Sequence, residues 1–229
     1  MARPADPNAK EALVAAARAE FARKGLVGAR IEDITAACGL SKGSFYLHFN
    51  SKEALFGELV ETFLGRIAKC DDSRERRMAE FVAQHGNITR RDLLEHTPRY
   101  RQILEIEAGE DRSILEIMWE YRDVLGVLLR GAQGTKFEGA IWEITDREVQ
   151  RIKENFDRSQ FDHACRTDIP PEMIGSLIVG TYLLLGMRMS RMSEKPDLTE
   201  WAHSLHTLIR EGSIPPEQNP EVRPSRSQS

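Results

Sequence analysis

Residues 39–55 read GLSKGSFYLHFNSKEAL, and this stretch places polar side chains on one short helix held between neighbouring helices. Before it, Ile31 and Ile34 recur at the spacing of one helix face, and Gly39 is suited to the left-handed turn that ends a helix. Ser41 can cap a second helix with its hydroxyl group. The stretch therefore predicts a helix, a turn and a second helix.

The second helix of this pair has a polar face and an apolar face. Phe45 and Phe49 are four residues apart and are predicted to pack inward. Lys42 can donate to guanine or to phosphate, Ser44 can bond base edges or backbone, and Gly43 permits close approach. Each residue alone would be an ordinary solvated position, but their common spacing favours DNA.

Further motifs extend the pattern on both sides. They are Phe-Ala-x-x-Gly at 21–25, Ile-x-x-Ile at 31–34, His-Phe at 48–49 and Ser-Lys-Glu-x-Leu at 51–55. Together with residues 39–46 they resemble the DNA-binding domain of the TetR family of bacterial repressors, over about residues 13–64. The resemblance implies an all-α chain with an N-terminal three-helix helix-turn-helix domain and a larger C-terminal helical domain for ligand binding and dimerisation.

The resemblance also assigns phosphate contacts to Tyr46 and His48, while Arg30 stands where the family usually has a small hydroxyl residue and can restore that contact by its charge. Leu47 can touch a thymine methyl group, and Lys52 begins the next helix, where the dipole favours an anion. The predicted DNA-binding residues are Arg30, Lys42, Gly43, Ser44, Tyr46, Leu47, His48 and Lys52.

Charge divides the chain in the same way. Residues 1–50 hold seven Lys or Arg against five Asp or Glu, whereas residues 51–229 hold 25 basic and 31 acidic residues. This asymmetry fits a small polyanion-binding head on an acidic body. We call residues 1–50 the head and 51–212 the body, and we predict that the Pro- and Ser-rich tail, 213–229, is disordered.

Helix signals recur along the body and strand signals are nearly absent. We expect helices at about 73–85, 90–109, 112–131, 146–166, 171–193 and 197–211. Thr97 before Pro98 and the pairs Thr145–Glu148 and Asp197–Glu200 are predicted helix starts. A glycine-rich loop is expected at 131–139.

Two apolar helices at 171–193 and 197–211 predict a homodimer, because a helix that is apolar all round must be covered on all sides. The alternative, burial inside one subunit, accounts for part of this surface. The predicted interface residues are Ile178, Leu185, Leu198, Trp201, Leu205, Leu208 and Ile209.

The body has no diagnostic ligand motif. Aromatic and Met side chains near the glycine-rich loop and on the apolar helix are predicted to line a small-molecule pocket, although such residues are more often core. They are Met118, Trp119, Tyr121, Phe137, Trp142 and Tyr182. The acids between Glu105 and Glu120 suggest a solvated face, with a cationic effector as the alternative.

Other classes of function have little support. Cys38, Cys70 and Cys165 are three in number without a metal spacing, which favours a reducing cytoplasm and no metal or cofactor. His163 and Cys165 point to different helix sides, so no catalytic residue is predicted. There is no signal-peptide pattern, and the apolar run 173–187 is shorter than the ~20 residues of a membrane span.

We therefore predict a ligand-responsive transcriptional regulator, most simply a homodimeric repressor that a small-molecule effector releases from a palindromic double-stranded operator. The alternatives are a dimeric helical interaction protein and a helical-bundle enzyme.

Overall fold

The computed structural model describes residues 7–130, 132–161 and 166–213, and within these residues the chain forms ten helices and no strand. This confirms the all-α prediction. Residues 214–229 of the predicted disordered tail, together with His163 and Cys165, lie outside the described residues, whereas Ser213 is the last residue of α10. The helices are α1 (Pro7–Gly28), α2 (Ile31–Ala37), α3 (Lys42–His48), α4 (Lys52–His85), α5 (Arg90–Leu94), α6 (Pro98–Glu120), α7 (Arg122–Arg130), α8 (Ala140–Phe161), α9 (Pro171–Met189) and α10 (Leu198–Ser213).

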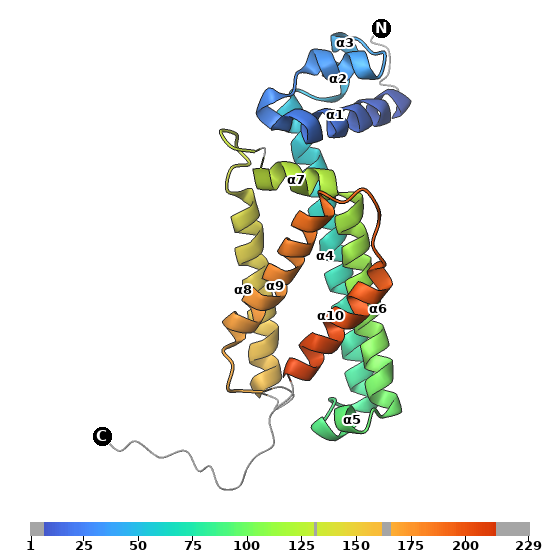
Figure 1. Ribbon diagram of the computed structural model, residues 1–229, viewed down its shortest axis with the longest axis vertical. Helices are drawn as coiled ribbons and strands as arrows, with labels where there is room; N and C mark the ends of the chain where they lie inside the picture. The colour runs from blue at the N-terminus through green and yellow to red at the C-terminus, as the bar shows by residue number, and fades with distance from the viewer. Residues whose placement is uncertain (1–6, 131, 162–165, 214–229) are drawn as a thin grey trace, which may run out of the picture.

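Helices α1, α2 and α3 form a small unit at one end of an elongated molecule (Figure 1). Their apolar faces share one core in which Phe21, Ile34 and Phe45 are almost fully buried. The last turn of α1 is kinked at Gly25, whose φ of 71° lies in the left-handed region that glycine tolerates. The glycine of the Phe-Ala-x-x-Gly motif therefore marks a kink inside α1, which continues to Gly28.

Helix α4 is the continuous rod that joins this unit to the rest of the chain (Figure 1). Ser51 caps its first turn by accepting a hydrogen bond from the Ala54 amide at 3.0 Å. Leu55 and Phe56 are fully buried, and the Phe56 ring meets Phe21 edge to face at 5.5 Å between centroids. The rigid rod therefore begins inside the core of the head.

The body is a bundle around α4. Helix α6 packs along α4, α10 packs against α6, and α8 packs against α9, while α7 crosses beneath α1 at the junction with the head (Figure 1). Thr97 caps α6 by accepting from the Tyr100 amide at 3.3 Å, and Asp197 accepts from the first amides of α10. Both predicted helix starts are confirmed.

Several predicted boundaries are wrong: 73–85 is the end of the continuous α4, the predicted helix 90–109 is divided at 95–97, the predicted helix 112–131 is divided at Tyr121, and α9 ends at Met189 rather than at 193. Helix α6 runs through residues 110–111, where a break was expected, because the acids there are buried and paired with distant residues. Helix α8 begins at Ala140 rather than at 146, and the hydroxyl of Thr145 donates to the Trp142 carbonyl instead of capping the helix.

Helix α9 has 19 residues and, among the described helices, is the one long and apolar enough by length and composition to cross a membrane. The apolar run expected from the sequence, 173–187, is shorter than a membrane-spanning helix. The whole of α9 is long enough, so its length alone does not exclude a membrane span. In the fold, α9 packs on α8, α7 and α6, with Ile174, Val179 and Met189 buried. Met173, Leu177 and Leu184 on another face of α9 are exposed.

Candidate nucleic-acid interface and ligand cavity

The turn between α2 and α3 has the geometry expected from residues 39–41. Gly39 adopts a φ of 69°, and the Leu40 amide donates back to the Thr35 carbonyl at 2.9 Å. Ser41 then caps α3, because its hydroxyl accepts from the Ser44 amide at 3.1 Å. The predicted helix-turn-helix is confirmed in its local geometry.

Helix α3 presents one face outward. Tyr46 and Leu47 are 56% and 62% exposed, Lys42 is exposed, and Ser44 and His48 are half-buried, while Phe45 and Phe49 fill the core. An added Cβ at Gly43 would meet only the Ser41 hydroxyl, at 3.5 Å. Packing inside the head therefore does not require glycine at this position.

The basic groups around α3 differ in their contacts. Lys42 forms an ion pair with Glu32 across the turn and lowers the pKa of that carboxyl group by hydrogen bonding. Arg30 is exposed at the start of α2, and its side chain makes no capping hydrogen bond. Lys42 must leave Glu32 before its ammonium group can meet a base or a phosphate.

Lys52, the first residue of α4, is turned toward the backbone of the head rather than standing free on its rim. Its Nζ donates to the carbonyl oxygens of Val27 and Ala29 at 2.9 and 2.8 Å, near the end of α1. These carbonyl groups lie where a helix leaves acceptors unpaired, and the ammonium group satisfies them. Lys52 thus ties α4 to the segment between α1 and α2.

A cavity of about 330 Å³ lies within the body, bounded by α4, α6, α7, α8 and α9. Its wall is mainly apolar. The apolar lining includes Phe63, Leu64, Ile67, Ile114, Met118, Leu125, Leu129, Ile141, Ile144, Ile152, Ile178, Val179 and Leu183. A concave apolar space with a few polar groups is the usual form of a small-molecule site.

Polar side chains gather where α4 meets α8 and α9. Asp71 on α4 faces Arg151 on α8 at 3.0 Å, and burial raises the pKa of Asp71 although Arg151 opposes the shift. Arg74 pairs with Asp111, but its Nε and the buried hydroxyl of Tyr182 have no hydrogen-bond partner among the described residues. The Tyr182 hydroxyl nevertheless lies close enough to Asp111 and Arg74 to interact with both, so these polar groups form one buried cluster at the cavity wall.

A buried charge network fastens α10 to α6. The ring nitrogens of His206 lie 2.9 Å from Asp111 Oδ2 and 2.5 Å from Glu107 Oε2, and Arg210 pairs with Glu107. Burial by itself would raise the pKa of Glu107, but Arg210 and His206 lower it to about 2. Both imidazole nitrogens face acceptors, so the geometry fits a protonated His206.

The residues predicted to line a pocket do not all lie together. Met118 and Tyr182 line the cavity. The other four lie elsewhere: Trp119 stacks with Arg122, Tyr121 packs on Phe63, Phe137 packs on Phe56, and Trp142 is 67% exposed.

The residues of α4 that line the cavity were not predicted from the sequence, although the sequence contains a pattern that indicates them. The four-residue repeat Leu55, Leu59, Phe63 continues to Ile67 and then to Asp71. An acid in register with an apolar stripe is a candidate polar group of a pocket.

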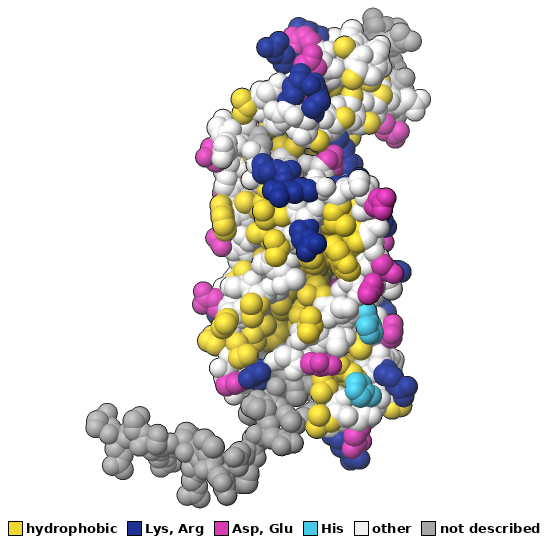
Figure 2. Space-filling view, viewed as in Figure 1, with side chains coloured by type: hydrophobic (Ala, Val, Ile, Leu, Met, Phe, Trp, Pro, Cys, Tyr) yellow, Lys and Arg dark blue, Asp and Glu magenta, His cyan; other side chains and the backbone are white. Residues whose placement is uncertain are grey.

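The residues predicted for a dimer surface differ in burial and do not form one exposed face. Leu198 is buried, Ile178 lines the cavity, Leu185 packs against the core, and Trp201, Leu205 and Ile209 are half-buried, whereas Leu208 is 71% exposed. On α9 the exposed apolar side chains are Met173, Leu177 and Leu184. Figure 2 shows hydrophobic side chains gathered on the body face that carries α9 and α10.

The chain resembles known proteins in sequence and in fold. The family described as bacterial regulatory proteins, tetR family, matches residues 13–59. The chain is 30% identical to the HTH-type transcriptional regulator CymR of Pseudomonas putida over 172 residues, which cover 64% of this chain and 82% of CymR. It is 33% identical to the HTH-type transcriptional repressor AcnR of Corynebacterium efficiens over 171 residues, which cover 73% of this chain and 74% of that protein.

Other matches are shorter or concern only the fold. With three further curated relatives, the matched region spans 19%, 33% and 25% of the relative's own length. Among solved structures, NalD, the secondary repressor of the MexAB-OprM multidrug efflux pump in Pseudomonas aeruginosa, superposes with a TM-score of 0.61 at 17% identity. That superposition covers 90% of this chain and 96% of NalD.

Proposed function

The chain belongs to the TetR family of bacterial DNA-binding transcriptional regulators, a family that is not enzymatic, and on this basis we propose a homodimeric repressor that a small-molecule effector releases from a palindromic operator. The observation that carries the proposal is the outward face of α3, with Lys42, Tyr46 and Leu47 exposed on a capped helix.

In the proposed complex, α3 enters the major groove. Lys42 and Ser44 meet base edges, Leu47 meets a thymine methyl group, and Gly43 lets the backbone come close. Tyr46, His48 and Arg30 contact phosphates along the groove wall. Lys52 contributes by holding the end of α1 in place, since its ammonium group is already bound to two carbonyl oxygens.

One head offers few contacts, so we propose that two chains bind together. The proposed interface is the outward face of α9 and α10, made by Met173, Leu177, Leu184, Leu205 and Leu208, with residues 1–50 as the DNA-binding head and 51–212 as the dimerising body. A two-fold axis through this face would present two copies of α3 to half-sites one helical turn, ~34 to 36 Å, apart.

The effector site is proposed for the cavity between α4 and α8. Among the described residues, Asp71 and Arg151 form an ion pair that joins α4 to α8. A ligand in the cavity would displace this pair or push against it. Because α4 begins inside the core of the head, a change in its tilt moves α3. A hundredfold loss of operator affinity needs ~2.7 kcal/mol of differential binding, and by linkage the operator weakens the effector equally.

The experiment starts with selection of the operator from a random duplex pool by the full chain. Fluorescence anisotropy then compares the selected duplex with a scrambled duplex of the same length and composition. We expect tighter binding to the selected duplex by about a thousandfold or more. Equal affinity for both duplexes would overturn the proposed operator recognition.

A further inference from the structure

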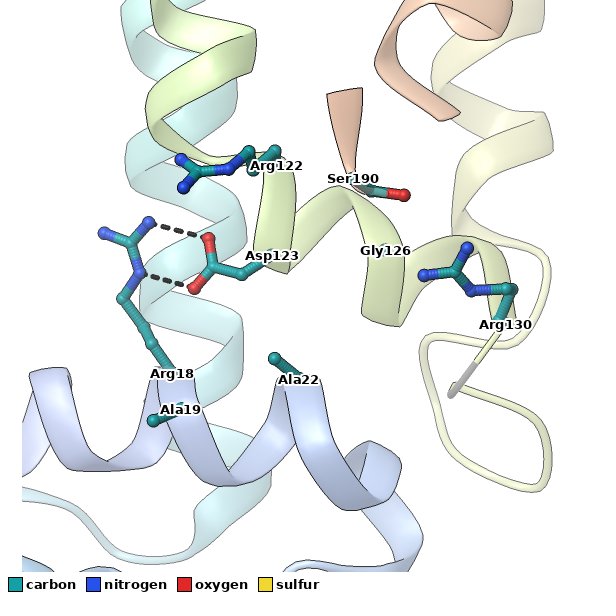
Figure 3. Close-up of a pocket in the computed structure, with 8 residues that line it drawn as sticks. All are labelled: Arg18, Ala19, Ala22, Arg122, Asp123, Gly126, Arg130 and Ser190. Carbon is teal, nitrogen blue, oxygen red and sulfur yellow. Dashed lines mark hydrogen bonds and ion pairs between the residues drawn. The ribbon is translucent and has the colours of Figure 1, made fainter. Parts of the chain in front are cut away.

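Besides the cavity in the body, the structure has a second hollow of about 370 Å³ between α1 of the head and α7 of the body (Figure 3). Helix α1 contributes Arg18 and the small side chain of Ala22, α7 contributes Arg122 and Arg130, and Ser190 adds a hydroxyl group from the end of α9. Three guanidinium groups from two helices therefore surround one space, which we call the junction hollow.

The charges of the junction hollow are unbalanced. Asp123 is the one carboxylate in its lining, and Arg18 already binds both oxygens of that group at 2.7 Å. Arg122 stacks 4.1 Å above the Trp119 ring and donates to the Trp119 carbonyl oxygen at 2.9 Å. Three arginines against one aspartate leave a lining charge of +2.

Arg130 is the arginine with free donors. No ion pair or hydrogen bond of its side chain is seen among the described residues. Figure 3 shows its guanidinium group directed back along α7 toward Gly126, on the opposite side of the hollow from the Arg18–Asp123 pair. A Cβ at Gly126 would lie 3.1 Å from Arg130 Nη2 and 3.4 Å from Ser190 Cβ, so glycine provides room there.

We propose that the junction hollow binds a compact organic polyanion that carries two or more carboxylate or phosphate groups. Guanidinium groups present paired donors that match both kinds of anion. Arg130 supplies the unused fork, Arg122 and Ser190 stand along the same wall, and Ala22 leaves space on the head side. A volume of about 370 Å³ is in the range of small-ligand sites, which suits a molecule with more than one anionic group.

The position of the hollow gives the anion a regulatory effect. Arg18 belongs to the head and its partner Asp123 to the body, so this ion pair links the two parts. An anion beside the pair competes with Asp123 for Arg18 and adds its own contacts to α7. We therefore expect the bound anion to change the orientation of the head relative to the body. The binding of the anion is independent of the proposed DNA-binding function, whereas its regulatory effect rests on that function.

The test is calorimetric titration of the full chain, in chloride buffer at constant ionic strength, with tricarballylate, with pyrophosphate and with uncharged propane-1,2,3-tricarboxamide. At least one anion is expected to bind saturably, one per chain, and the triamide is expected not to bind. Loss of the Arg130 donors in Arg130→Ala should weaken that binding about tenfold or more, with Arg130→Lys in between.

The matched control is Arg101→Ala, which removes the same charge from an exposed position on α6, remote from the hollow. It should leave anion affinity within about twofold of the wild type, because a screened distant charge contributes little. Arg130 is itself exposed, so its substitution leaves the core intact.

Saturable binding that Arg130→Ala weakens and Arg101→Ala does not supports the junction site, and the preferred anion shows whether carboxylate or phosphate is the natural group. No saturable binding of either anion, or equal weakening by both substitutions, would overturn it. Operator affinity is measured separately, so a failure of the anion site and a failure of DNA binding give different results.

Discussion

Lys42 and Lys52 carry the same charge but meet different partners in the head. Lys42 is exposed and pairs with the exposed Glu32, an interaction that water and salt screen at the surface. Lys52 is held against two backbone carbonyl groups near the end of α1. The first lysine is free to exchange its partner for DNA, and the second is part of the fold.

Separate substitutions distinguish these roles. Lys42→Ala should leave the unfolding temperature nearly unchanged, weaken operator binding and relax base preference at one or two base pairs. Lys52→Ala should lower the free energy of unfolding by ~1–3 kcal/mol, because two carbonyl groups lose their donor. Thermal melting and anisotropy on the same samples measure both effects. A stable Lys52→Ala variant together with an unstable Lys42→Ala variant would reverse this assignment.

His206 gives the body a pH dependence whose direction can be derived. Burial opposes its protonation, but Asp111 and Glu107 outweigh burial and raise the pKa of His206 above its ordinary value of 6.5. Its contribution to stability is therefore complete below pH 6.5 and is lost as the pH rises through the raised pKa of the folded state.

We expect urea unfolding of the wild type to show falling stability above this range, with a weaker fall in His206→Gln. His203→Gln is the control, because His203 is exposed on the same helix. An unchanged pH slope in His206→Gln would show that another group is responsible.

At the scale of elements, the outward faces of α9 and α10 are the proposed dimer surface. Leu184 and Leu94 are both 59% exposed, but Leu94 lies on α5, away from that surface. Leu184→Asp should place an unpaired carboxylate in a desolvated seam at a cost of several kcal/mol and give monomers. Leu94→Asp should leave the dimer intact. Light scattering measures both masses, and a Leu184→Asp dimer would move the interface elsewhere.

Elements set by local chemistry could be predicted from the sequence. Gly39, the Ser41 cap, the Thr97–Pro98 start and the Asp197 cap act within a few residues of themselves, and the structure confirms them. The unbroken course of α6 could not be predicted, because its acids are neutralised from other helices. Glu110 is paired by Arg77 and Asp111 by Arg74 and His206, which lie 33 to 95 residues away.

Contacts between distant segments also explain why the residues of α3 could be predicted from the sequence while most residues of the cavity could not. The face of α3 follows from spacing within one short helix, so its exposed residues were identified by sequence. The cavity is formed by five helices, and the expected solvated face of α6 is wrong at Glu107, Glu110 and Asp111, which are buried. Contacts between distant segments decide which apolar and charged residues line it.

At the scale of the whole molecule, sequence-specific DNA binding by a dimer is tested most directly by the salt dependence of operator affinity. Lys52 is held by the carbonyl oxygens of Val27 and Ala29, so Arg30 and Lys42 from two subunits should neutralise ~4 phosphates and the log–log slope should be roughly −3.6. The selected operator should show this slope while binding far more tightly than a scrambled duplex at each salt concentration. A slope near zero, or unchanged binding by a variant in which Arg30, Lys42 and Tyr46 are all alanine, would contradict the proposed docking of α3.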